Sequence, residues 1–173
     1  MLAILLDSIG ISQISCEVFR WANELSASLV PVTVYYQQNG EILEQPMFPV
    51  MQMKHVYMNQ HNIVATSLDT LKVALSVFKP ASINLLAYDL EWVFTNQNSA
   101  DVYELYSKAN ILCRSRLHAD QLKLALGFDA TVLYNLNTEA SLEWVETLPK
   151  VGCKVYTPRE NQWPLCNPID EAE

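Results

Sequence analysis

Short apolar runs alternate with amphipathic stretches along most of the chain. Four of these runs end in a polar residue and lead into a helical pattern: residues 2–6, 83–87, 111–113 and 130–133. Two further strands are expected over residues 30–36 and 63–66. Apolar strands that alternate with amphipathic helices predict a parallel sheet. The predicted fold class is therefore α/β, with a mostly parallel Rossmann-like sheet and helices on both faces.

The expected helices carry apolar residues three and four positions apart. Residues 10–26 have one such stripe, made of Ile11, Ile14, Val18, Ala22 and Leu25. Ser67 is placed to cap the next helix, and Gly127 is placed to end a helix over residues 116–126. Two more helices are expected, over about residues 98–108 and 138–148.

Residues 39–62 have a less regular pattern. Asn39-Gly40 is a strong hairpin turn signal, and one or two short strands with an irregular loop are expected after it. Two prolines make a regular buried strand doubtful there, so core packing and contact with a partner both stay open. The candidate partner-binding residues are Met47, Phe48, Met51, Met53, Tyr57 and, from the C-terminal segment, Trp163.

Composition favours a single domain. The chain has 173 residues, of which 50% are hydrophobic and 17% are charged. Residues 1–148 are expected to form the domain, and residues 149–173, which hold four prolines, an extended C-terminal arm. The net charge of −8, without a basic cluster, argues against nucleic-acid binding. No amphipathic basic segment or leader is recognised, so the expected location is the cytoplasm, without membrane contact.

The sequence contains none of the common cofactor or metal motifs. The chain has no P-loop, no H-E-x-x-H, no G-x-S-x-G and no C-x-x-C, so neither a cofactor nor a metal is expected. The four cysteines lack metal-ligand spacing and are interpreted as reduced, small apolar residues. Cys153 and Cys166 are close enough in sequence to pair, which a cytoplasmic setting disfavours.

The polar residues that follow the strands are the candidate ligand-binding residues, because open α/β sheets bind ligands at the carboxyl ends of their strands. Asp7, Ser8 and Gly10 either form an anion- or sugar-binding turn or simply end a strand and cap a helix. A carboxylate pair beside an aromatic ring could hold a sugar or act as a base, and the alternative is a solvated loop. The residues concerned are Asp89, Glu91 and Trp92.

A second group of candidates surrounds the starts of the last two helices. Arg114 and Arg116 could bind a phosphate or a carboxylate, whereas Ser115 fits a helix cap. His118 is either an acid–base group or a structural histidine. Asn135 and Asn137 could cap the last helix or bind a ligand.

Three sequence segments carry a family resemblance: YDLEW at 88–92, ANILCRS at 109–115 and GFDATVLYNLN at 127–137. They resemble the second half of the N-terminal, acceptor-side domain of GT-B glycosyltransferases, and DSIGIS at 7–12 is similar to the loop before that domain's first helix. Short proteins of tailed phages also look similar. In the family a second domain binds the nucleotide-sugar, and neither that domain nor its glutamate motif is recognised here.

The resemblance implies two functional hypotheses, and the loop over residues 7–10 suggests a third. The first is a non-catalytic half-GT-B domain that binds proteins or assembles, with phage structural proteins or with itself, in the host cytoplasm or a virion. The second is a glycosyltransferase that acts only with a partner chain supplying the nucleotide-sugar domain. The third is a small-ligand sensor that uses the loop over residues 7–10.

Overall fold

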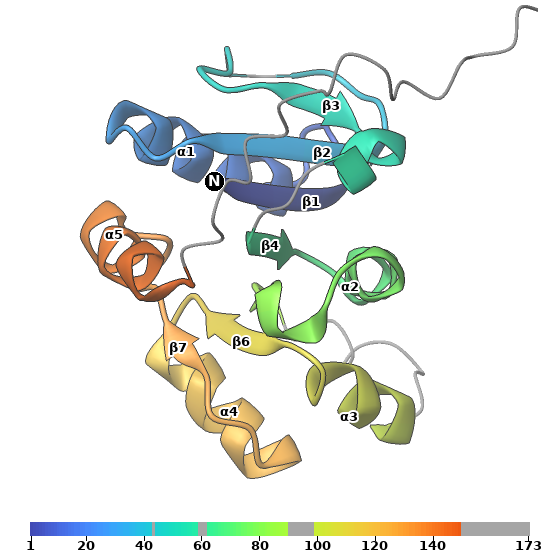
Figure 1. The fold of residues 1–173 in the computed structure, drawn as a ribbon. Helices are drawn as coiled ribbons and strands as arrows, with labels where there is room; N and C mark the ends of the chain where they lie inside the picture. The colour runs from blue at the N-terminus through green and yellow to red at the C-terminus, as the bar shows by residue number, and fades with distance from the viewer. Residues whose placement is uncertain (43, 59–61, 90–98, 150–173) are drawn as a thin grey trace, which may run out of the picture.

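The structure is a computed structural model that describes residues 1–42, 44–58, 62–89 and 99–149. Within these residues all strands are parallel and form one sheet, in the order β3-β2-β1-β4-β5-β6-β7 (Figure 1). The predicted α/β class and its Rossmann-like sheet are confirmed. The strands are β1 (Leu2–Ser8), β2 (Val32–Gln38), β3 (Val50–Gln52), β4 (Asn62–Ala65), β5 (Ile83–Ala87), β6 (Asn110–Cys113) and β7 (Thr131–Val132).

Helices cover both faces of the sheet. The α-helices are α1 (Gln13–Ala27), α2 (Leu68–Val77), α3 (Ser99–Tyr106), α4 (Arg116–Leu126) and α5 (Thr138–Thr147), and the 3-10 helices are η1 (Met53–Met58) and η2 (Pro80–Ser82). Side chains alternate along each strand, so β1 sends Leu2, Ile4 and Leu6 to one face, and Ala3 and Leu5 to the other. The first face packs on α1 and α5, the second on α2, α3 and α4.

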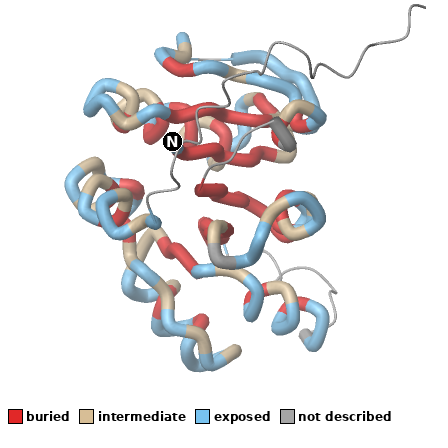
Figure 2. The backbone as a smooth tube through the Cα atoms, viewed as in Figure 1, coloured by how far each residue is buried: buried red, intermediate tan, exposed pale blue. Residues whose placement is uncertain are grey.

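The central strands are the most deeply buried part of the molecule (Figure 2). All seven positions from Asn62 to Leu68 and all five of β5 are buried, as near-continuous apolar runs in a parallel sheet require. Cys113 lies in this core, where burial raises the pKa of its thiol to about 11. A thiol with that pKa stays protonated at neutral pH, which agrees with the expected inert, apolar role.

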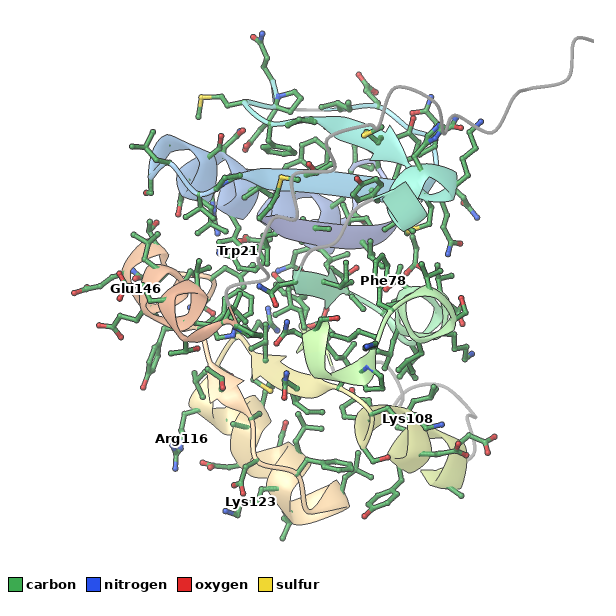
Figure 3. The ribbon with its side chains drawn as sticks, in the orientation of Figure 1. Trp21, Phe78, Lys108, Arg116, Lys123 and Glu146 are labelled. Carbon is green, nitrogen blue, oxygen red and sulfur yellow. The ribbon has the colours of Figure 1, made fainter. Side chains whose placement is uncertain are left out.

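Helix α5 returns from the β7 side of the sheet to pack on α1. The contact is made by Trp21, whose Nε1 donates a hydrogen bond to Ser141 Oγ at 2.9 Å. Its ring also lies 6.2 Å from the ring of Trp144. Figure 3 shows Trp21 between the two helices. A buried indole that finds both an apolar neighbour and an acceptor fixes the position of α5.

The structure corrects two local predictions. Asn39-Gly40 does not form a hairpin, because β2 and β3 are parallel and pair from Val34↔Val50 to Tyr36↔Gln52. Ile11 does not belong to the apolar stripe of α1, because the helix begins at Gln13 and the Ile11 side chain is 77% exposed. From residue 150 on, the predicted C-terminal arm lies outside the described residues, and Cys153 and Cys166 with it.

Candidate functional site

The carboxyl ends of the parallel strands meet at one edge of the sheet, which we call the carboxyl edge. The strand order reverses direction between β1 and β4, since β1 is followed by its neighbour β2 and β4 by its neighbour β5. In doubly wound sheets this reversal opens a ligand crevice. The residues that stand at this position are Asp7 on β1, and Thr66, Ser67 and Thr70 after β4; we call their surroundings the β1–β4 crevice.

The polar groups of the β1–β4 crevice are bonded to one another. Thr66 Oγ1 donates to the carbonyl oxygen of Leu5 at 2.7 Å, which ties the ends of β4 and β1 together. Thr70 Oγ1 accepts from the backbone N–H groups of Thr66 and Ser67 at 3.0 and 2.9 Å. Ser67 Oγ accepts from Thr70 N at 3.0 Å, which confirms Ser67 as the cap of α2. These hydrogen bonds engage the side chains of the crevice with one another and with the end of β1.

Asp7 is the ionisable residue that β1 contributes to the crevice. Burial raises the pKa of its carboxyl group, and the nearby charge of Asp69 raises it further. A hydrogen bond with the Ser67 side chain acts in the opposite direction. Because ionisation is disfavoured here, the ionised form of Asp7 costs stability at neutral pH. Ser8 is the last residue of β1, and neither it nor Asp7 caps α1, whose cap is Ser12.

A second polar cluster lies where β5 and β6 end, and we call it the Arg114 corner. Arg114 Nη2 lies 3.0 Å from Asp89 Oδ1, and its guanidinium sits 4.5 Å from the ring centroid of Tyr88. The Tyr88 hydroxyl accepts a hydrogen bond from Gln13 Nε2 at 3.1 Å. Two predicted residues, Asp89 and Arg114, are therefore brought together. The predicted Glu91 and Trp92 lie outside the described residues.

A left-handed turn follows β7. Tyr134, Asn135 and Leu136 have φ angles of 42°, 61° and 59°, which side-chain-bearing residues rarely adopt in succession. The Asn135 N–H donates to the Arg114 carbonyl oxygen at 2.6 Å, which holds the turn beside the Arg114 corner. Asn135 does not cap the last helix. Asn137 does, since its side chain accepts from Glu139 N at 2.9 Å.

The start of α4 contributes little to the corner. Ser115 caps the helix, as predicted, by accepting from His118 N at 3.3 Å. Arg116 pairs with Asp120 at 3.2 Å and points away from the ribbon into solvent (Figure 3). His118 is partly buried, and its Nδ1 atom is enclosed without a hydrogen-bond partner in the described part of the chain. The predicted cationic patch is therefore divided between the corner and the outer surface.

Sequence reasoning missed a small pocket at the carboxyl edge. It lies between the loop after β1, the first turns of α1 and the loop after β2, and has a volume of about 80 Å³. We call it the Ile42 pocket; its lining residues are Ile9, Gly10, Ser15, Cys16, Phe19, Glu41, Ile42 and Glu44. The two loops touch, because a Cβ atom at Gly40 would lie 2.0 Å from the Ile9 carbonyl oxygen. No signal in the sequence indicated it, because the spacing of Ile11 fits the apolar stripe of a helix and its 77% exposure is seen only in the structure.

The predicted partner-binding surface is smaller than expected. Phe48 and Met53 are buried, and Phe48 packs edge-on against Phe19 with ring centroids 5.5 Å apart. Met47 and Met51 remain exposed, at 62% and 37%. Tyr57 lies in η1, and Trp163 lies outside the described residues. Hydrophobic burial against α1 explains the loss of Phe48 from the surface.

Comparison with known proteins gives no relative. No family model matches the chain, and neither a curated protein nor a solved structure matches it. Among the described residues, no three His, Cys, Asp or Glu side chains are grouped so that they could hold a metal ion. None of the described helices combines the length and the apolar character that crossing a bilayer requires.

Proposed function

We propose that this chain is a non-catalytic protein-binding component, and that a partner protein covers the carboxyl edge around the Ile42 pocket. The observation that carries the proposal is the exposure of two isoleucines, Ile11 at 77% and Ile42 at 41%. They stand on the two loops that touch at Gly10 and Gly40. Ile42 lines the pocket, and Ile11 directly follows Gly10, which also lines it. Exposed apolar side chains near a pocket are typical of protein interfaces.

The hydrogen bonds of the β1–β4 crevice support the same proposal. Thr66, Ser67 and Thr70 satisfy one another and the strand ends, so they are engaged in holding the fold. At the Ile42 pocket, in contrast, the Ile42 side chain is 41% exposed to solvent. The half-GT-B resemblance, and a setting in tailed-phage assembly in the host cytoplasm or virion, belong to this proposal as its evolutionary context.

Capture of binding proteins by the immobilised chain tests this proposal. An extract of the cells that make the protein is passed over wild type, over the double variant Ile11→Ser/Ile42→Ser, and over Leu124→Ser. Leu124 is 91% exposed on α4, so the last variant is matched in exposure but distant from the pocket. We expect a protein that binds wild type and Leu124→Ser but not the double variant. Equal capture by all three would contradict the proposal.

A glycosyltransferase completed by a partner chain is the second candidate function. Two observations favour it: the raised pKa of Asp7, and the pairing of Arg114 with Asp89 and Tyr88 at the same edge. A carboxyl group with a raised pKa suits proton transfer from a sugar hydroxyl, and a guanidinium suits a phosphate. The hypothesis requires UDP-sugars at millimolar concentration to shift the amide NMR signals of Asp7 and Arg114. Unchanged spectra would remove it.

A further inference from the structure

The Ile42 pocket is lined by both apolar and acidic residues. Ile9, Phe19 and Ile42 supply carbon surface, and we call the two acidic lining residues, Glu41 and Glu44, the acidic rim. Both glutamates are exposed, and neither forms an ion pair with another described residue. Two unpaired carboxylates beside an apolar cavity attract a group that is both aliphatic and cationic.

The volume of the pocket limits which chemical groups it can hold. A cavity of about 150 Å³ holds a benzene ring, whereas about 10–15 Å³ holds one water molecule. At about 80 Å³ the Ile42 pocket lies between these limits, so it suits a short aliphatic chain better than an aromatic ring. Lysine carries a compact ammonium group on a flexible four-carbon stem, and arginine carries a wider planar guanidinium.

We propose that the Ile42 pocket receives a lysine side chain of the partner protein. The lysine stem lies against Ile9, Phe19 and Ile42, and its ammonium group lies between the carboxylates of Glu41 and Glu44. The net charge of −8 attracts a basic partner surface over a longer range. This inference rests on the proposed function, because it names the chemistry of the partner at the same edge.

The binding of n-butylammonium tests the inference without any knowledge of the partner. The probe reproduces the stem and the charge of lysine, and n-butanol reproduces the stem alone. Amide NMR spectra of the full chain are recorded during titration with each compound. We expect n-butylammonium to shift the signals of Gly10, Cys16 and Ile42 in a saturable manner, with weakening at high salt, and n-butanol to bind more weakly.

Two double variants test which negative charges contribute to the binding of n-butylammonium. Glu41→Gln/Glu44→Gln removes the acidic rim, and Glu143→Gln/Glu146→Gln removes the same charge from the exposed side of α5 (Figure 3 labels Glu146). We expect the rim variant to bind n-butylammonium about fivefold to tenfold more weakly, and the α5 variant to bind it like wild type. All four side chains are exposed, so both variants should fold.

Three results would overturn the lysine assignment: no saturable shift in wild type, equal binding of n-butanol, or equal weakening by both double variants. A further variant, Cys16→Met, enlarges a side chain that lines the pocket and should displace the probe while leaving Glu41 and Glu44 in place. These outcomes are independent of the capture experiment. If n-butylammonium binds but no partner protein is captured, the proposed function is refuted. If a partner protein is captured but n-butylammonium does not bind, the lysine assignment is refuted.

Discussion

The β1–β4 crevice and the Ile42 pocket lie at the same edge of the sheet, but they differ in how far their side chains are engaged in contacts within the protein. In the crevice, the hydroxyl groups of Thr66, Ser67 and Thr70 form hydrogen bonds with buried backbone donors and acceptors. Around the pocket, Ile11 and Ile42 expose carbon surface to solvent and two glutamates lack ion-pair partners among the described residues. The difference teaches that polar residues at the position where a Rossmann-like fold usually binds its ligand are engaged here in holding the fold. We therefore propose that the neighbouring loops carry the binding surface.

The substitution Thr70→Val should have the largest effect on stability. Valine keeps the shape of threonine but leaves the buried N–H groups of Thr66 and Ser67 without their acceptor. We expect a loss of about 3 kcal/mol in the free energy of unfolding, measured by urea denaturation. Thr131→Val, on the exposed edge strand, is the matched control and should change stability little. If Thr70→Val were as stable as the control, the crevice would not serve the fold.

Gly40→Ala should destabilise the pocket region next. The added Cβ would lie 2.0 Å from the Ile9 carbonyl oxygen, so one of the two loops has to move. We expect a loss of about 2 kcal/mol and a weakened binding of n-butylammonium. Gly10→Ala is the control, because a Cβ there meets no atom within 4 Å. Equal effects of the two substitutions would show that the loops do not depend on this close approach.

Asp7→Asn tests how the charge of Asp7 affects stability. The pKa of Asp7 is raised above its ordinary value of 3.8 in the folded chain, so the folded state holds this proton more tightly than the unfolded state. The stability that protonated Asp7 provides is therefore complete below pH 3.8 and is lost as the pH rises through the raised pKa. We expect Asp7→Asn to be more stable than wild type at pH 7, with a difference that shrinks toward pH 4. Thermal unfolding at several pH values measures this, and a constant difference would contradict the burial of Asp7.

The smallest effect on stability is expected for Ile11→Ser/Ile42→Ser. Both side chains are exposed, so their replacement removes little buried surface and should change the free energy of unfolding by less than about 0.5 kcal/mol. The same variant is expected not to bind the partner protein in the capture experiment. Circular dichroism during urea denaturation checks the first expectation. A large loss of stability would mean that these isoleucines support the fold, and the contrast with the crevice would fail.

Local signals accounted for most of the fold. The caps at Ser67, Ser115, Asn137 and Gly127 were predicted correctly, because a capping side chain or a glycine acts within one turn of its helix. The parallel pairing of β3 with β2 was missed. Asn39-Gly40 favours a hairpin by its local conformational preference. The parallel pairing joins two strands on either side of residues 39–49, and no short sequence motif indicates such a pairing.

The candidate site was predictable only in part. The position of Asp89 and Arg114 at neighbouring strand ends followed from the strand pattern, because parallel strands end at the same edge. The Ile42 pocket did not follow, since its two loops are about thirty residues apart in sequence and meet only through the close approach of Gly40 to Ile9. The apolar residue Ile11 fitted a helical stripe by spacing, and only the start of α1 at Gln13 removed it from the core.

Hydrogen exchange of the chain, alone and bound to the captured partner protein, tests the central claim most directly. The account predicts slower exchange on binding in the loop that contains Gly10 and Ile11 and in the loop that contains Gly40 and Ile42. It predicts no change at Thr66, Ser67 and Thr70, whose hydrogen bonds are already made in the free chain. Protection confined to the outer face of α4, or the absence of any bound protein, would contradict it.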